Sequence, residues 1–283
     1  MGMLLLKPAR FGYINAKCRT LKADLLDDAF YEKALQSEGL GDIFTLLKST
    51  AYAPYIKDAE KESIESGVQA SFENLYTKSL SVLKKEESAI FELFFRERKR
   101  LAAKQLPPAG ASGESLQFQK GDLEYIGKLK KALTAMEREQ KRDLSKILGS
   151  YFDILNLYTV VRLRILYRLE PEEIVPFLVP YGLELDMKVL AAAAGMTTLS
   201  EISDTVHEKI GSAFSGYHEF RHALAEYHLR MLRRVWYGYP FKLSVIFSLL
   251  RMKEIEVKNI RSLAEGLFYR LPREEIAKML VGV

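Results

Sequence analysis

The sequence predicts an all-α protein assembled from helical repeats. Alternation of apolar and polar residues, which would indicate a half-buried strand, does not extend over any useful length of the 283 residues. Turn-forming residues instead separate long segments whose apolar residues have helical spacing. In addition, residues 167–174 and 269–276 are near copies of each other, 102 positions apart. Repeats of one helical unit are typical of scaffolds and adaptors.

The helices are expected to lie between clusters of glycine and proline, and the 106–120 segment is expected to be the tip of a helical hairpin. The expected helices are 12–36, 39–49, 56–105, 121–169, 171–178, 186–193, 198–235, 241–268 and 272–281. The expected division is an N-terminal lobe (1–110), a loop or hairpin tip (111–121), a middle lobe (122–215) and a C-terminal lobe (216–283).

Each of the two similar segments is expected to form a long helix, a tight corner and a short helix. The first long helix, 147–166, is apolar almost all round, which predicts that it is buried. Pro171 suits the first position of the short helix, where no backbone N–H is needed, and the two following glutamates suit the helix dipole. In both long helices an acid precedes an asparagine by three residues: Asp153 and Asn156, then Glu256 and Asn259. The spacing from asparagine to the corner differs by one residue, which indicates a duplication with one small slip.

These two segments, together with residues 13–19 and 46–55 near the N-terminus, resemble the C subunit of the A/V-type rotary ATPases and ATP synthases. The same subunit is called d in the vacuolar enzyme. The resemblance rests on 13–19 and 46–55 near the start, 151–157 and 171–174 in the middle, and 254–261 and 271–276 at the end. No single motif is specific, but their order along the whole chain is. The residues interpreted as a repeat-packing signature are Tyr13, Asn15, Arg19, Asp153, Asn156, Arg162, Glu256, Asn259 and Arg261.

The resemblance implies a funnel-like, elongated structure of three lobes with no catalytic residues, bound metal or cofactor. It implies a socket between the central shaft subunits and the membrane ring of proteolipid subunits, supporting proton or sodium transport coupled to ATP synthesis or hydrolysis. It also implies a peripheral position on the cytoplasmic face of a membrane, with membrane contact through partners only. We expect no direct binding of nucleic acid.

The composition agrees with this interpretation. A hydrophobic content of 48% is enough for a sizeable core, and one cysteine, Cys18, excludes an internal disulfide. No segment reaches about 18 uncharged apolar residues, so we expect no membrane span. No glycine-rich phosphate loop is present, which argues against direct ATP hydrolysis by this chain.

The main alternative is a zinc hydrolase, because His218, Glu219 and His222 match the H-E-x-x-H pattern and His228 has the spacing of a third ligand. The third ligand requires a chain reversal, for which a glycine is needed where Ala225 stands. On a continuous helix, His228 would lie about 15 Å from His218 along the axis. We therefore favour a structural role for the histidines.

A second alternative is a basic helical adaptor for nucleic acid. The runs 96–100 and 128–131 are basic, but acidic residues are interleaved and the net charge is only +5, which favours solvated helix faces. A denser basic and aromatic cluster either packs at a helix corner or is a candidate protein interface, because arginine, tryptophan and tyrosine anchor interfaces. Its members are Arg230, Arg233, Arg234, Trp236, Tyr237 and Tyr239.

Overall fold

The computed structural model describes residue 12 and residues 16–97, 112–237 and 242–282. The structure is 74% helical, and the described residues contain no strand, so the predicted all-α class is confirmed. The chain divides into two compact units, residues 1–83 with 232–283 (unit 1) and residues 84–231 (unit 2). The bounds of the three predicted lobes do not coincide with these units, and the funnel shape stays a prediction.

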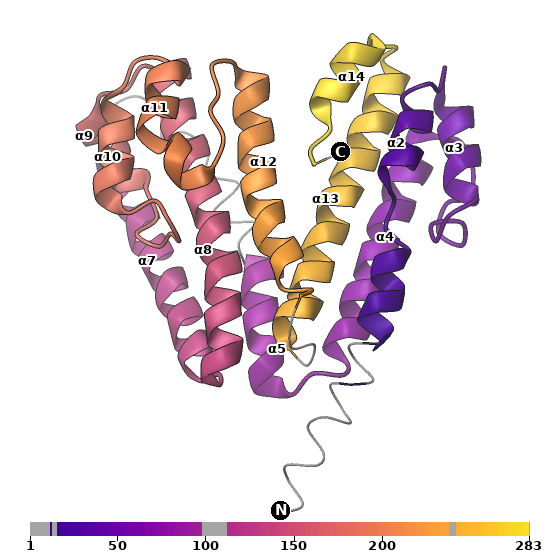
Figure 1. Cartoon of the computed structure of the whole chain (residues 1–283), viewed down its shortest axis with the longest axis horizontal. Helices are drawn as coiled ribbons and strands as arrows, with labels where there is room; N and C mark the ends of the chain where they lie inside the picture. The colour runs from indigo at the N-terminus through magenta and orange to yellow at the C-terminus, as the bar shows by residue number, and fades with distance from the viewer. Residues whose placement is uncertain (1–11, 13–15, 98–111, 238–241, 283) are drawn as a thin grey trace, which may run out of the picture. The chain divides into compact units, whose positions relative to one another are not determined.

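Unit 1 is centred on a pair of long helices, α4 (Lys61–Leu80) and α13 (Leu243–Phe268), which lie side by side (Figure 1). Three shorter helices complete it: α2 (Asp28–Ala34), α3 (Leu40–Lys48) and α14 (Arg273–Met279). Helix α14 folds back over the end of α13, while α3 contacts both α2 and α13. The N-terminal and C-terminal parts of the chain therefore share one core.

Unit 2 is built around α8 (Arg138–Val161), which packs against α7 (Ser112–Thr134) and α10 (Met187–Gly195). Its core combines side chains from α8, α10, α11 and α12, such as Leu157, Leu190, Ile202 and Phe220, which are all fully buried. The remaining elements are α5 (Lys85–Glu92), η1 (Leu93–Glu97), η2 (Arg162–Leu166), α9 (Pro171–Ile174), η3 (Val175–Phe177), α11 (Leu199–Ile210) and α12 (Tyr217–Arg234).

Four of the expected helices are each divided at a short turn, where a local residue ends one helix or starts the next. Asp27 begins α2 by accepting the Phe30 N–H at 2.9 Å, which separates α2 from the helical residues 16–23. Glu87 accepts the Lys84 N–H at 2.8 Å and starts α5, and α8 starts after a short turn at Glu137. Gly211, with φ of 79°, ends α11 in the left-handed conformation that favours glycine.

The expected loop or hairpin tip at 111–121 differs from the structure on its C-terminal side, where the helix α7 begins earlier than expected. Residues 112–121 belong to α7, so within the described residues no loop remains there beyond Ser112. The cluster of proline and glycine at 107–113 therefore marks a helix start at its C-terminal edge. The rest of that segment, 98–111, lies outside the described residues.

Candidate functional site

The asparagine of the middle copy joins two segments of unit 2. Asn156, on α8, donates from Nδ2 to the Val179 carbonyl at 2.9 Å and accepts the Val179 N–H at 2.8 Å. Asn156 and Val179 are each 1% exposed. Buried backbone groups must find hydrogen-bond partners. This paired contact supplies them for the N–H and carbonyl of Val179, in the extended segment that follows the short helices.

Asn259 makes the same pair of bonds in unit 1. Its Nδ2 donates to the Val281 carbonyl at 3.0 Å, and its Oδ1 accepts the Val281 N–H at 3.1 Å. The separation along the chain is 22 residues here and 23 residues between Asn156 and Val179. We call each of these contacts an asparagine joint. The two similar segments thus have the same local hydrogen bonding.

The acid one turn earlier extends each joint to a further segment. Asp153 is fully buried and accepts the backbone N–H groups of residues 183, 184 and 185 at 3.0–3.2 Å, together with the Tyr227 hydroxyl at 2.6 Å. Burial raises the pKa of Asp153, and the bonds from Tyr227 and the backbone oppose that rise. Gly182 leaves room for this contact, since a Cβ there would lie 2.6 Å from the Leu185 carbonyl oxygen and closer still to the Asp153 carboxylate.

Glu256 plays the corresponding part in unit 1 but reaches the N-terminal half of the chain. Its carboxylate accepts the Leu26 N–H at 2.6 Å and the Tyr52 hydroxyl at 2.7 Å, and it pairs with Lys253 at 2.7 Å. Lys253 Nζ also lies 3.8 Å from the centre of the Tyr52 ring. Burial, reinforced by the nearby Glu256 charge, raises the pKa of Tyr52, so this hydroxyl stays a donor. The network fastens residues 26 and 52 to α13.

The extra residue of the middle copy is contained in a π-helical turn. Asn156 is eleven residues before Tyr167, whereas Asn259 is ten before Tyr269, and η2 lies in the longer interval. A π-helical turn holds one more residue than the α-helix that it interrupts. The insertion therefore leaves no loop, and the two corners keep equivalent positions in the two copies.

At both corners an arginine has a left-handed backbone. Arg168 has φ of 57° and Arg270 has φ of 53°, and they are the non-glycine residues with positive φ in the described part of the chain. Each is followed by a leucine whose N–H closes the end of the long helix, Leu169 on Leu163 at 3.0 Å and Leu271 on Gly266 at 2.9 Å. Glycine is the residue favoured at such a helix end, and another residue costs about 1 kcal/mol more.

The other residues of the predicted signature lie outside the two joints. Arg162 and Arg261 each have a buried Nε without a hydrogen-bond partner in the described residues, while Nη2 of Arg261 donates to Gln69 at 3.1 Å. Arg19 donates to the Trp236 carbonyl at 3.3 Å. Tyr13 and Asn15 are outside the described residues.

The candidate interface residues do not share one environment. Trp236 is 7% exposed and donates from Nε1 to Ser248 Oγ at 2.9 Å, which makes it a packing residue. Arg230 donates to the Ile210 carbonyl at the end of α11. Arg233 and Arg234 are exposed and Tyr237 is 80% exposed, so the interface stays a prediction for these three. Tyr239 lies outside the described residues.

The residues of the H-E-x-x-H pattern are not arranged as a zinc site. The Glu219 carboxylate accepts the backbone N–H groups of Ser215 at 2.8 Å and Gly216 at 3.3 Å, so it caps the start of its own helix. These bonds lower the pKa of Glu219. His218 and His222 are exposed on α12, whereas His228 is buried with Nδ1 2.9 Å from Ser150 Oγ. Among the described residues there is no group of three or more potential ligands placed to hold a metal ion.

The basic run 128–131 is partly neutralised by its own helix. Lys128 pairs with Glu124 at 3.4 Å, and such a pair is typical of a solvated helix face. Residues 98–100 of the first run are outside the described residues.

The sequence interpretation did not identify the partners of the two acids. Lys253, Tyr227 and Gly182 complete the joints from segments without a motif of their own. Tyr52 lies in the 46–55 segment that carries the resemblance, but no role was predicted for it. Only the acid–asparagine spacing pointed to this chemistry.

The fold and the joints define a class: an all-α protein of duplicated helical units with buried polar joints. The chain belongs to the family of ATP synthase (C/AC39) subunits, which it matches over residues 14–99 and 121–279. It is 22% identical to the C subunit of the A-type ATP synthase of Methanocaldococcus jannaschii, over 97% of this chain and 87% of that protein. It is also 22% identical to the C subunit of the A-type ATP synthase of Pyrococcus horikoshii, over 99% of this chain and 92% of that protein. The family inferred from the ordered sequence motifs is therefore confirmed.

Proposed function

We propose that this protein is a non-catalytic coupling subunit of a V/A-type rotary ATPase. In this role it is a socket between the central shaft subunits and the membrane proteolipid ring, and it supports proton or sodium transport coupled to ATP synthesis or hydrolysis. The observation that carries the proposal is the family match, which extends through both units of the structure.

The described part of the chain also fits a place beside the membrane. None of its helices is both long enough and apolar enough to span a bilayer. We therefore propose that the protein is peripheral, at the cytoplasmic face, and that it reaches the membrane through its ring partner.

The two polar joints suit a part that transmits force. A coupling subunit must not yield between its two partners, so its segments need contacts that cannot slide past one another. Paired bonds such as those of Asn156 and Asn259 fix one register, because a shift by a single residue would leave buried backbone groups without partners. Glu256 adds two further segments to the same helix, α13.

The test is an assembly of the rotary complex with and without this protein, reconstituted into vesicles. We expect the assembly that lacks it to hydrolyse ATP in its soluble head but to move no ions, because chemistry and transport have lost their mechanical link. Ion pumping at the normal rate without the protein would contradict the proposal. Zinc content measured on the same purified protein tests the hydrolase alternative, for which one metal ion per chain is required.

A further inference from the structure

The four histidines of the chain have different environments. His207 is used by the fold, since its Nδ1 lies 3.1 Å from the Ser203 carbonyl oxygen, and His228 is only 2% exposed. His218 and His222 are exposed instead, and neither forms a hydrogen bond with another described residue. These two imidazole rings therefore have nitrogens that are open to a ligand.

The two exposed histidines form a pair on α12. They are four residues apart, so they lie on one face of the helix, one turn from each other. Their ring centres are 6.5 Å apart. Metal–nitrogen bonds of about 2 Å place two nitrogens on one ion about 3 Å apart. Rotation of the two exposed side chains about their own single bonds closes this difference, so both rings can bind the same ion.

The charges around the pair favour a bound cation. Arg221 lies between the two histidines in the sequence, but it is hydrogen-bonded to Tyr158 of α8, so its charge is held against the unit's own helices. The pKa of Glu219 is lowered by its bonds with Ser215 and, to a smaller extent, by the neighbouring His218. This nearby carboxylate offsets the cost of placing a cation beside the first turns of a helix.

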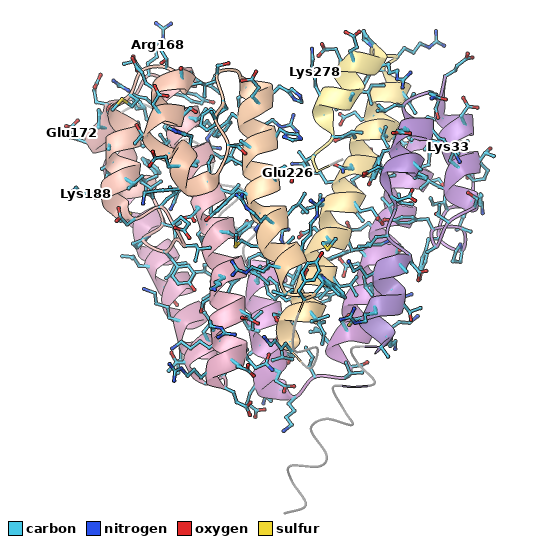
Figure 2. The ribbon with its side chains drawn as sticks, viewed as in Figure 1. Lys33, Arg168, Glu172, Lys188, Glu226 and Lys278 are labelled. Carbon is cyan, nitrogen blue, oxygen red and sulfur yellow. The ribbon has the colours of Figure 1, made fainter. Side chains whose placement is uncertain are left out.

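No third protein ligand completes the pair within the described residues. Glu226 comes one turn after His222, on the side of α12 that is turned away from α8 (Figure 2), yet no group of three potential ligands is close enough to hold one ion. Glu219 caps its own helix, so it cannot activate a bound water. A catalytic zinc site, which needs three protein ligands, is therefore not formed. Two imidazole nitrogens with water oxygens are instead the ligands that suit Cu²⁺ or Ni²⁺.

We propose that His218 and His222 form an exchangeable binding site for a divalent copper or nickel ion. The two imidazoles occupy neighbouring positions on the ion, and water or a ligand from another molecule occupies the rest. Cu²⁺ binds more tightly than Ni²⁺, in the usual order for nitrogen ligands. Because the folded helix holds the two rings one turn apart, the ion also stabilises the folded protein. This site is separate from the proposed coupling role, which requires no metal.

The test uses the full chain, purified without a histidine tag, freed of metal with a chelator and kept at about pH 8, where a solvated imidazole is neutral. Calorimetric titration with NiCl₂ is expected to show one ion bound per chain. His218→Gln and His222→Gln should each weaken Ni²⁺ binding at least about tenfold, because a single imidazole no longer gains from the second one. Electron paramagnetic resonance with CuCl₂ should show two coordinating nitrogens in the unchanged protein and one in either variant.

His207→Gln and Glu226→Gln are the matched controls, and both should leave Ni²⁺ binding unchanged. Circular dichroism should show the same helix content in all four variants, since the histidines of the pair are exposed. Normal Ni²⁺ binding in either variant of the pair would overturn the site. Equal weakening in His207→Gln would place the ion elsewhere, and equal weakening in Glu226→Gln would replace the pair by a three-ligand site, so either result would overturn the proposal.

Discussion

Replacing Asn156 by alanine should cost more stability than the same change at Asn259, although both asparagines make the same pair of bonds. In Asn156→Ala the Val179 N–H loses its acceptor in a site that is 1% exposed, and water cannot replace it. The Val179 carbonyl still accepts the Tyr181 N–H at 2.8 Å, so a single backbone group is orphaned. An orphaned buried donor costs about 1–3 kcal/mol and the second lost bond about 1 kcal/mol, so we expect about 2–4 kcal/mol.

At Asn259 the partner is less enclosed. Val281 is partly exposed, so water can reach its N–H and carbonyl after the change. The expected cost of Asn259→Ala is therefore about 1–2 kcal/mol. Urea unfolding followed by circular dichroism measures both values, and hydrogen exchange with mass spectrometry locates the loss. Peptides that contain Val179 should exchange faster in Asn156→Ala, while those that contain Val281 should not change.

Two results would refute this reasoning. One is a cost below about 0.5 kcal/mol for Asn156→Ala, which would mean that the buried pair adds nothing beyond a surface contact. The other is a larger cost at Asn259, which would mean that burial does not set the difference.

Three further outcomes follow from the same structure. Gly182→Ala should lower the stability by about 2–4 kcal/mol, because the new methyl group would clash with the Asp153 carboxylate and the Leu185 carbonyl. Gly195→Ala is the control and should cost nothing, since the space around Gly195 is open. Equal melting temperatures for the two variants would contradict this prediction. Glu219→Gln should make the loss of stability at acid pH less steep, because the pKa of Glu219 is lowered in the folded state. The stabilisation from the charged Glu219 is fully present above its unfolded pKa of about 4.3. This stabilisation disappears as the pH falls through the lower pKa of the folded state. Unfolding curves between about pH 2.5 and 6 measure this effect, and an unchanged profile would count against the cap. Burial raises the pKa of Cys18 to about 11, so a maleimide at about pH 8 should label this thiol slowly in the folded protein and quickly in urea; fast labelling of the folded chain would be inconsistent with its burial.

The helical class and the joint chemistry were accessible from the sequence for physical reasons. Helical spacing of apolar residues is a local property, and breaking residues limit where helices can run. An acid and an asparagine one turn apart in an apolar helix, as in Asp153 and Asn156, indicate buried polar groups that require partners. The duplicated corner was visible because the two copies are still alike in residue type.

The remaining features depend on contacts between segments that are distant in the chain. The Tyr52 hydroxyl meets Glu256 204 residues later, and no local pattern marks Tyr52 for that contact. The sequence left Trp236 with two possible places, a helix corner or an interface, and only its contact with Ser248 in the next helix shows that it is buried. The division of long helices was missed because single side chains such as Asp27 and Glu87 decide it. The left-handed arginines gave no signal, since arginine does not indicate positive φ.

The order of synthesis has a consequence for the discontinuous unit. A ribosome makes residues 1–83 first, yet their packing partner α13 begins only at Leu243, so the apolar face of α4 has to wait while unit 2 is translated. Unit 2 is continuous in the chain and can close before translation ends. The first-made segment is thus the last to be buried, and until then it depends on chaperones or on its own solubility to escape aggregation.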